Sequence, residues 1–176
     1  AFVRLILQIL VSIFIIQNGI FIVYLGEYNF LNIFKIKIND LKILGFLLTI
    51  FSITCIVNAY NFIDGLDGLA GSSIIISSLT LLFFTFFHNK FLFDQHFFLI
   101  IFLYLNFLFL LFNKNLFFKL KIFYGDSGST FIGFMFGWIL IYYAHPSNDF
   151  IHPIMAIWCI TLPMYDLCFT FCVYVL

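Results

Sequence analysis

Charged side chains are scarce in this 176-residue sequence. Only 9% of the residues are charged, and eight Lys or Arg balance eight Asp or Glu, so the formal net charge is zero. This balance leaves no basic face for nucleic acid and no polybasic segment for anionic lipid. The chain is instead 64% hydrophobic with a mean hydropathy of +1.16, far above the roughly 45–50% apolar content of soluble domains. Both values exclude an ordinary soluble domain and indicate a membrane protein.

The sequence also lacks the spacings of a disulfide framework or a zinc site. Its four cysteines lie inside apolar runs, without a CxxC pair or neighbouring histidines. We therefore expect these cysteines to act as buried small hydrophobic residues. No signal-peptide cleavage pattern precedes the first apolar run. Because the chain begins at Ala1 and stops at Leu176 within apolar runs, we expect a fragment truncated at both ends.

Apolar runs long enough to cross a bilayer recur along the whole chain. A helix needs about 20 apolar residues to cross a membrane, whereas barrel strands need about 10 with strict alternation. We therefore predict an all-α integral membrane protein, a polytopic bundle of transmembrane helices. The predicted spans number about six and cover roughly 3–25, 41–60, 71–87, 92–112, 128–144 and 153–176. For the alternating segment 34–40 we predict a short strand or hairpin at the interface.

Lys and Arg do not orient this bundle, because equal numbers fall on its two sides. The alternation of spans nevertheless places the connectors 61–70 and 113–127 on the same side. These two connectors are the polar, glycine-bearing ones, so we expect the chemistry there. The histidines are interpreted as interfacial residues on the opposite side: His88, His96, His145 and His152.

The first polar motif is NAYNFIDGLDGLAG, residues 58–71. Asn58, Asn61, Asp64 and Asp67 follow one another at intervals of three, so a helical continuation would stack them on one face. Each uncompensated carboxylate at membrane depth costs roughly 2.5–3.5 kcal/mol, so the pair calls for a cation or a polar ligand. The motif's glycines would let the backbone approach a bulky ligand closely. An Asx-rich helix cap is the alternative interpretation.

The second polar motif is KIFYGDSGSTFIG, residues 121–133. Its small residues lead straight into a helix, whose first-turn amides and positive dipole end can hold phosphate. Asp126 can hold a divalent cation, and Mg²⁺ prefers one or two carboxylates together with phosphate oxygens and water. A plain Asp/Ser helix cap is the alternative here. Asp166 in the last span is a weaker functional candidate, with a helix-packing role left open.

The two motifs, in this order and spacing, resemble the polyprenyl-phosphate N-acetylhexosamine-1-phosphate transferase family (glycosyltransferase family 4). RLILQ at residues 4–8 and HPIMAIWCITLPMYDL at 152–167 resemble the undecaprenyl-phosphate GlcNAc-1-phosphate transferase branch. The resemblance covers nearly the whole chain. It implies a single transmembrane catalytic domain over residues 1–176, multi-pass in the bacterial inner membrane, with a cytoplasmic active site.

The implied reaction transfers an N-acetylhexosamine 1-phosphate, with GlcNAc as first choice, from a UDP-sugar to undecaprenyl phosphate and releases UMP. It would prime a cell-surface polysaccharide such as the O-antigen of lipopolysaccharide. The implied cofactor is Mg²⁺, with Mn²⁺ as an alternative. The implied partners are the UDP-N-acetylhexosamine, undecaprenyl phosphate and the lipid bilayer, without nucleic acid, and a homodimer stays open. The sugar, the pathway and a one-step or covalent mechanism are not distinguished.

The resemblance also implies roles for individual residues. Asp126 would bind the metal, with Asn58 or Asn61 completing the shell, and Phe123 and Asn113 fall where the family recognises uridine. The expected catalytic residues are Asp64, Asp67 and Asp126. The expected substrate-binding residues are Asn61, Gly68, Asn113, Lys121, Phe123, Ser127 and Ser129.

Two elements of the family pattern do not occur in the sequence. An aspartate pair should precede Arg4, and a histidine-rich loop should follow Leu176, so we expect the 176 residues alone to be inactive. Two other interpretations stay open. One is a transporter or channel whose intramembrane acidic residues line a pathway, and the other is a noncatalytic membrane scaffold.

Overall fold

The structure is a computed structural model, which describes residues 2–23, 42–65, 68–87, 93–113, 124–148 and 150–175. The regular structure within these ranges is entirely helical, which confirms the all-α prediction. The strand predicted at 34–40 lies outside the described residues. The helices are α1 (Phe2–Gln17), α3 (Lys42–Ile63), α4 (Leu69–Phe87), α5 (Phe93–Asn113), α6 (Gly125–Ala144), α7 (Pro153–Cys159) and α8 (Thr161–Val175).

Four of the described helices, α3 to α6, are long and apolar enough to cross a membrane, and the bent pair α7–α8 makes a fifth candidate. Their outward faces carry large apolar side chains, for example Phe51, Phe86 and Phe98, which are each about two-thirds exposed or more. Such a surface suits hydrocarbon rather than water. The chain is therefore a multi-pass membrane protein.

Two of the predicted spans differ from the observed helices. The first was expected at 3–25, but α1 has 16 residues and ends before Gly19, whose φ of +79° suits a glycine. The last, expected at 153–176, consists of two helices, and the chain bends by 64° between α7 and α8. Pro163 explains this break, because it has no amide hydrogen to donate to the carbonyl of Cys159, the last residue of α7.

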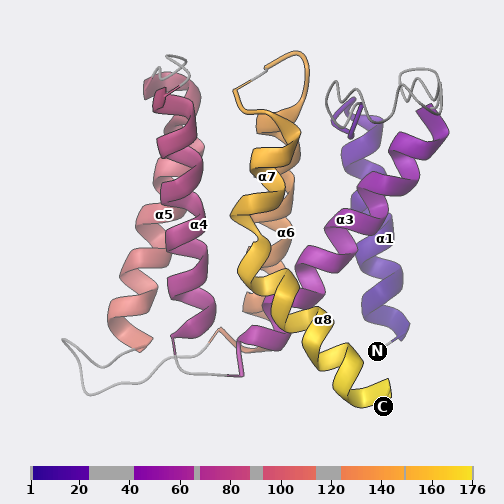
Figure 1. Ribbon diagram of the computed structural model, residues 1–176, viewed down its shortest axis with the longest axis vertical. Coiled ribbons are helices and arrows are strands. Elements are labelled where there is room, and N and C mark those ends of the chain that lie inside the picture. The colour runs from indigo at the N-terminus through magenta and orange to yellow at the C-terminus, as the bar shows by residue number, and fades with distance from the viewer. Residues whose placement is uncertain are drawn as a thin grey trace.

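Both polar motifs lie at one end of the bundle, at the bottom of Figure 1. There α3 ends, α4 begins, α5 ends and α6 begins, and the first residue of α1 lies at the same end. The described helix ends that flank the two polar connectors thus lie at one end of the bundle, as predicted.

The helices α3 and α6 form the centre of the bundle, where glycines let their backbones approach closely. A Cβ atom on Gly133 would lie 3.0 Å from the Cα of Val57 and 3.3 Å from the Cβ of Tyr60. Small residues of this kind permit close helix contacts in membranes. Tyr60 and Phe136, both fully buried, meet edge to face beside this contact.

We expect Gly133→Ala to destabilise the protein by about 1–3 kcal/mol, because its methyl group meets the backbone of Val57, which cannot rotate away. Gly137→Ala is the matched control, since the three atoms nearest its methyl group would be side-chain atoms of Ile56, at 3.5 Å or more. Thermal unfolding in detergent, followed by circular dichroism, measures both. Equal melting temperatures for the two variants would contradict the close contact.

The other helices attach to this centre by specific contacts. The α1 helix packs on α3 with Gln8, Ser12 and Ile15 buried. On the other side, α4 and α5 form a pair (Figure 1), and α5 reaches α6 through long side chains, including the stacked rings of Phe102 and Phe136.

His96 differs from its predicted interfacial position. Its ring is fully buried, and its Nδ1 lies 2.8 Å from the hydroxyl of Tyr143 on α6. The contact lies at the end of the bundle opposite the polar motifs. His96 is therefore a buried link between α5 and α6.

Candidate active site

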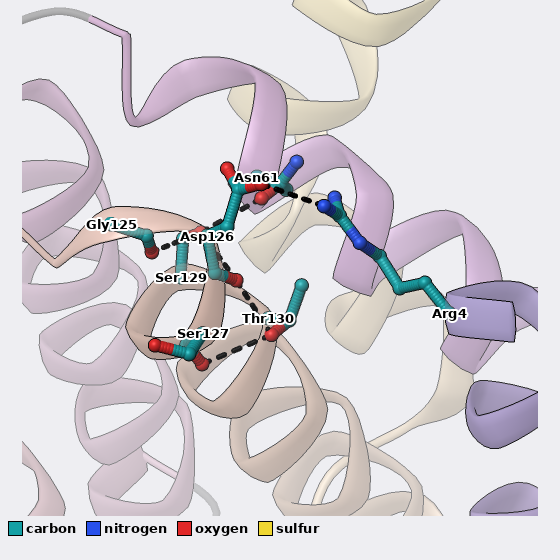
Figure 2. A network of polar contacts seen from close by, with 7 residues as sticks. All are labelled: Arg4, Asn61, Gly125, Asp126, Ser127, Ser129 and Thr130. Atoms are coloured by element: carbon teal, nitrogen blue, oxygen red, sulfur yellow. Dashed lines mark hydrogen bonds and ion pairs between the residues drawn. The ribbon is translucent and has the colours of Figure 1, made fainter. Parts of the chain in front are cut away.

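The first turn of α6 carries Asp126, and a cation from another helix meets it there. Arg4 on α1 donates a hydrogen bond of 2.7 Å from Nη2 to Oδ2 of Asp126, across 122 residues of sequence (Figure 2). The Asp126 side chain is 77% exposed and that of Arg4 is 40% exposed. The Asp126 carboxylate therefore faces water at the membrane edge, with one cation beside it.

The start of α6 is not the Asp/Ser helix cap that we considered as an alternative. The residue at the N-cap position is Tyr124, which makes no side-chain capping hydrogen bond. Asp126 lies in the first turn instead, beside the positive end of the helix dipole. Gly125 has a φ of +63°, a conformation that side-chain-bearing residues rarely adopt.

A hydrogen bond between Ser129 and Asn61 joins this turn to the end of α3. The buried Ser129 hydroxyl lies 3.0 Å from Oδ1 of Asn61 and 2.9 Å from the carbonyl of Gly125, either of which can accept its hydrogen (Figure 2). The two motifs, which are separated by 68 residues at this contact, thus meet directly. As placed, Asn61 and Ser129 bind each other, and their contact with substrate stays a prediction.

Asp64, immediately after α3, is the second carboxylate of the site. Burial raises the pKa of Asp64 above its ordinary value, and the negative charge of Asp126 adds to this rise. A hydrogen bond from the backbone of Gly125 to the Asp64 carboxylate acts in the opposite direction. Asp64 and Asp126 therefore lie close enough to repel each other. The hydrogen bond from the Gly125 backbone keeps the Asp64 carboxylate beside Asp126.

This raised pKa predicts a dependence of stability on pH. The folded state holds its proton on Asp64 up to a higher pH than the unfolded chain, so this contribution to stability is present below the ordinary pKa and is lost as the pH rises through the raised one. Asp64→Asn cannot titrate. We therefore expect its melting temperature, measured without divalent metal, to overtake that of wild type as the pH rises from about 4 to about 7. A difference between the two proteins that does not change with pH would contradict this.

A small pocket adjoins Asp64 between α4, α5 and the start of α6. It is too tight to hold a water molecule, and Asp64, Gly68, Asn113 and Tyr124 are among its lining residues. Gly68 has a φ of +77°, and Asn113 is buried as the last residue of α5. The structure thus brings the predicted residues Asp64, Gly68 and Asn113 together.

Other predicted residues are placed differently or are not described. The Nδ2 of Asn58 donates to Oε1 of Gln8 at 3.2 Å and to the carbonyl of Thr54 at 2.8 Å, which ties its side chain to the α1–α3 contact. Its role as a metal ligand stays a prediction. Ser127 is exposed on the first turn of α6, and Asp166 is half-buried in α8. Three predicted site residues lie outside the described part of the chain: Asp67, Lys121 and Phe123.

A profile of the family described as Glycosyl transferase family 4 matches residues 1–144, which include both motifs. The chain belongs to this family. Two similar relatives, from Escherichia coli K12 and Yersinia pestis, are both named undecaprenyl-phosphate alpha-N-acetylglucosaminyl 1-phosphate transferase. They are 32% and 31% identical over 124 residues, which is 70% of this chain but 33% of each relative. No solved structure matches the chain.

These relatives agree with the resemblance to the GlcNAc-1-phosphate transferase branch. A third, from Pasteurella multocida and of the same name, is 41% identical over 49 residues, which is 28% of this chain and 14% of the relative. The chain thus spans about a third of the length of the E. coli and Yersinia relatives. The activity of a complete family 4 protein is accordingly a proposal for this one.

Two residues of the site were not predicted as site residues from the sequence. From the sequence, Arg4 was part of RLILQ and was counted among the cations on the side of both motifs, and that position is the signal that could have identified it. Tyr124 lies inside the second motif, between Phe123 and Gly125, but nothing in the pattern of letters shows that its ring faces Asp64 and α5. Its contacts depend on tertiary structure.

Proposed function

We propose that the protein to which this chain belongs transfers GlcNAc 1-phosphate from UDP-GlcNAc to undecaprenyl phosphate. The reaction releases UMP and primes a cell-surface polysaccharide on the cytoplasmic side of the bacterial inner membrane. The observation that carries this proposal is the convergence of Asp64, the Gly125 turn, Asp126 and Arg4 at one membrane edge. The printed names of the relatives support the same donor sugar and lipid acceptor.

In this proposal the donor diphosphate lies over the first turn of α6. The amide groups of this turn and the guanidinium of Arg4 supply positive potential for its oxygens. Arg4 then exchanges part of its contact with Asp126 for the more highly charged ligand. Because Arg4 comes from α1, its contact also requires α1 to be docked against α3.

The donor set fits a divalent ion that is shared with the diphosphate. Among the described residues no group of three His, Cys, Asp or Glu side chains could hold a metal alone. One or two carboxylates are what Mg²⁺ takes from a protein when phosphate oxygens and water complete its shell. Asp126 would hold the ion with Asp64 nearby, and the repulsion between these carboxylates favours a cation there. When bound, Mg²⁺ neutralises charge that develops on the diphosphate.

The reaction forms a bond between an oxygen of the lipid phosphate and the sugar-bearing phosphorus of the donor. The bond from that phosphorus to the bridging oxygen breaks, and its electron pair leaves with UMP. Asp64 orients the attacking phosphate or the sugar, and no strong base is needed, because a phosphate monoester with a second pKa of about 6 is largely ionised at neutral pH. Positioning and electrostatics supply most of the acceleration.

The pocket beside Asp64 is the proposed place for the uridine. Asn113 lines it and offers an amide for the edge of the base, and Phe123 would supply ring stacking. In the structure it has no room for even a water molecule, whereas typical ligand pockets measure roughly 300–1,000 Å³, so nucleotide binding would require it to open.

Membranes that contain the full-length protein, assayed with undecaprenyl phosphate and a panel of radiolabelled UDP-sugars, test the proposal. We expect a lipid-linked product and UMP with UDP-GlcNAc, and less product with UDP-linked N-acetylquinovosamine or N-acetylfucosamine. Absence of product with every donor would refute the transferase. Ion or solute flux through liposomes without UDP-sugar consumption would establish the transporter instead.

A further inference from the structure

Tyr124 contacts two side chains of α5 and lies beside glycines of α4 and α6. Its hydroxyl donates a 2.9 Å hydrogen bond to Oδ1 of Asn106 on α5, and its ring stacks on Phe109, with 3.6 Å between the ring centres. On α4, a Cβ atom at Gly71 would lie 3.4 Å from the Tyr124 hydroxyl. On α6, a Cβ atom at Gly128 would lie 3.2 Å from the Cβ of Tyr124. Two glycines thus leave room for this side chain.

Asn106 is suited to fix the position of the phenol. It is buried, and its Nδ2 donates to the carbonyl of Phe102 at 2.7 Å, which orients the amide so that Oδ1 accepts from Tyr124. Removing the phenol would leave a buried oxygen without this donor, which is costly in a low-dielectric interior. The Tyr124–Asn106 bond therefore defines where the chain enters α6.

The next residue after Tyr124 is Gly125, whose backbone binds the Asp64 carboxylate, and Asp126 follows. The first amides of a helix have no partner within the helix. Protection of the Gly125 amide therefore depends on Asp64 and on the position of the turn. An anchor one residue before this turn controls both carboxylates at once.

We propose that Tyr124 is a positioning residue, which locks the Gly125 turn against Asp64 through its hydrogen bond to Asn106 and its stacking on Phe109. Tyr124 does not touch the reacting atoms. Without the Tyr124 hydroxyl, the distance between the Asp64 and Asp126 carboxylates is less well fixed. The expected effect of Tyr124 on kcat rests on the proposed transferase function. Its expected effect on the order of the Gly125 turn does not depend on any activity.

The structure offers a matched control at the other end of α6. Tyr143 also links α6 to α5 through its hydroxyl, which lies 2.8 Å from Nδ1 of the buried His96. Tyr124→Phe and Tyr143→Phe each remove one hydroxyl that bridges the same two helices. Only the first lies beside the candidate active site, so a general loss of helix packing affects both and a positioning role affects one.

Hydrogen exchange followed by mass spectrometry tests the structural part in the full-length protein. We expect the peptide that covers residues 124–130 to exchange roughly five- to tenfold faster in Tyr124→Phe and to be unchanged in Tyr143→Phe. Equal exchange in Tyr124→Phe and wild type, or equal acceleration in both variants, would overturn the inference whether or not the protein uses UDP-sugars.

Kinetics test the consequence for turnover. We expect kcat to fall roughly five- to tenfold in Tyr124→Phe, with the donor KM within about twofold of wild type. Asn106→Ala should lose a similar amount, and the double variant no more than either single one, because both remove the same bond. Additive losses, or a loss in Tyr143→Phe as large as in Tyr124→Phe, would overturn it. An inactive wild type with the expected exchange pattern would refute the transferase and leave the positioning role standing.

Discussion

Asp126→Asn is expected to abolish the lipid-linked product, leaving at most about one thousandth of the wild-type rate. The substitution keeps the size of the side chain and removes the negative charge that would hold the metal on the diphosphate. In the structure this charge is 77% exposed and paired only with Arg4 among the described residues. Exposed ion pairs of this kind contribute about 0–1 kcal/mol to stability. The fold should therefore survive a change that stops the chemistry.

Two further variants make this expectation specific. Asp126→Glu keeps the charge but moves it, so we expect partial activity with a higher requirement for Mg²⁺. Thr130→Val, one turn along the same helix, removes a hydroxyl that among the described residues bonds only to the carbonyls of Asp126 and Ser127, and its rate should stay within about threefold of wild type. Product is measured in membranes with matched protein amounts. A rate for Asp126→Asn close to wild type would remove this residue from the metal site.

The sequence was enough to predict that the chain is a membrane protein and that its two polar motifs lie on the same side, because both properties depend on local features of the sequence. The length of an apolar run decides whether a helix can cross the bilayer, and an even number of crossings returns the chain to the same side. The run after residue 17 continues to be apolar, which concealed the end of α1. The Asn18–Gly19 pair was the available signal, since glycine with positive φ commonly ends a helix.

The contacts that assemble the site could not be predicted in the same way. The Arg4–Asp126 pair joins residues 122 positions apart, and the Tyr124–Asn106 bond joins α6 to α5. No periodicity within one segment reports which faces of two helices meet. The motifs show which residues carry chemistry, whereas the packing of α1, α3 and α5 around α6 decides which of them share a pocket.

Arg4→Gln is expected to lower kcat/KM for the donor roughly a hundredfold, mainly through a higher KM. The guanidinium is 40% exposed and holds Asp126 across the gap between α1 and α6. If Arg4 also binds the donor diphosphate, its loss weakens binding of the ground state and of the transition state together. If it were only a surface ion pair, the loss would be within about 1 kcal/mol of stability and would not affect the KM.

Arg4→Lys separates charge from geometry. An ammonium keeps the positive charge but cannot make the two parallel hydrogen bonds that a guanidinium offers to a phosphate, so we expect an intermediate loss of about tenfold. Donor KM and kcat, measured at low and at high ionic strength, distinguish the two roles, because salt screens an exposed attraction between charges. Thermal unfolding provides the control, and all three proteins should melt within a few degrees of one another. Wild-type kinetic constants in Arg4→Gln would leave Arg4 a structural neighbour of Asp126 and remove it from the substrate site.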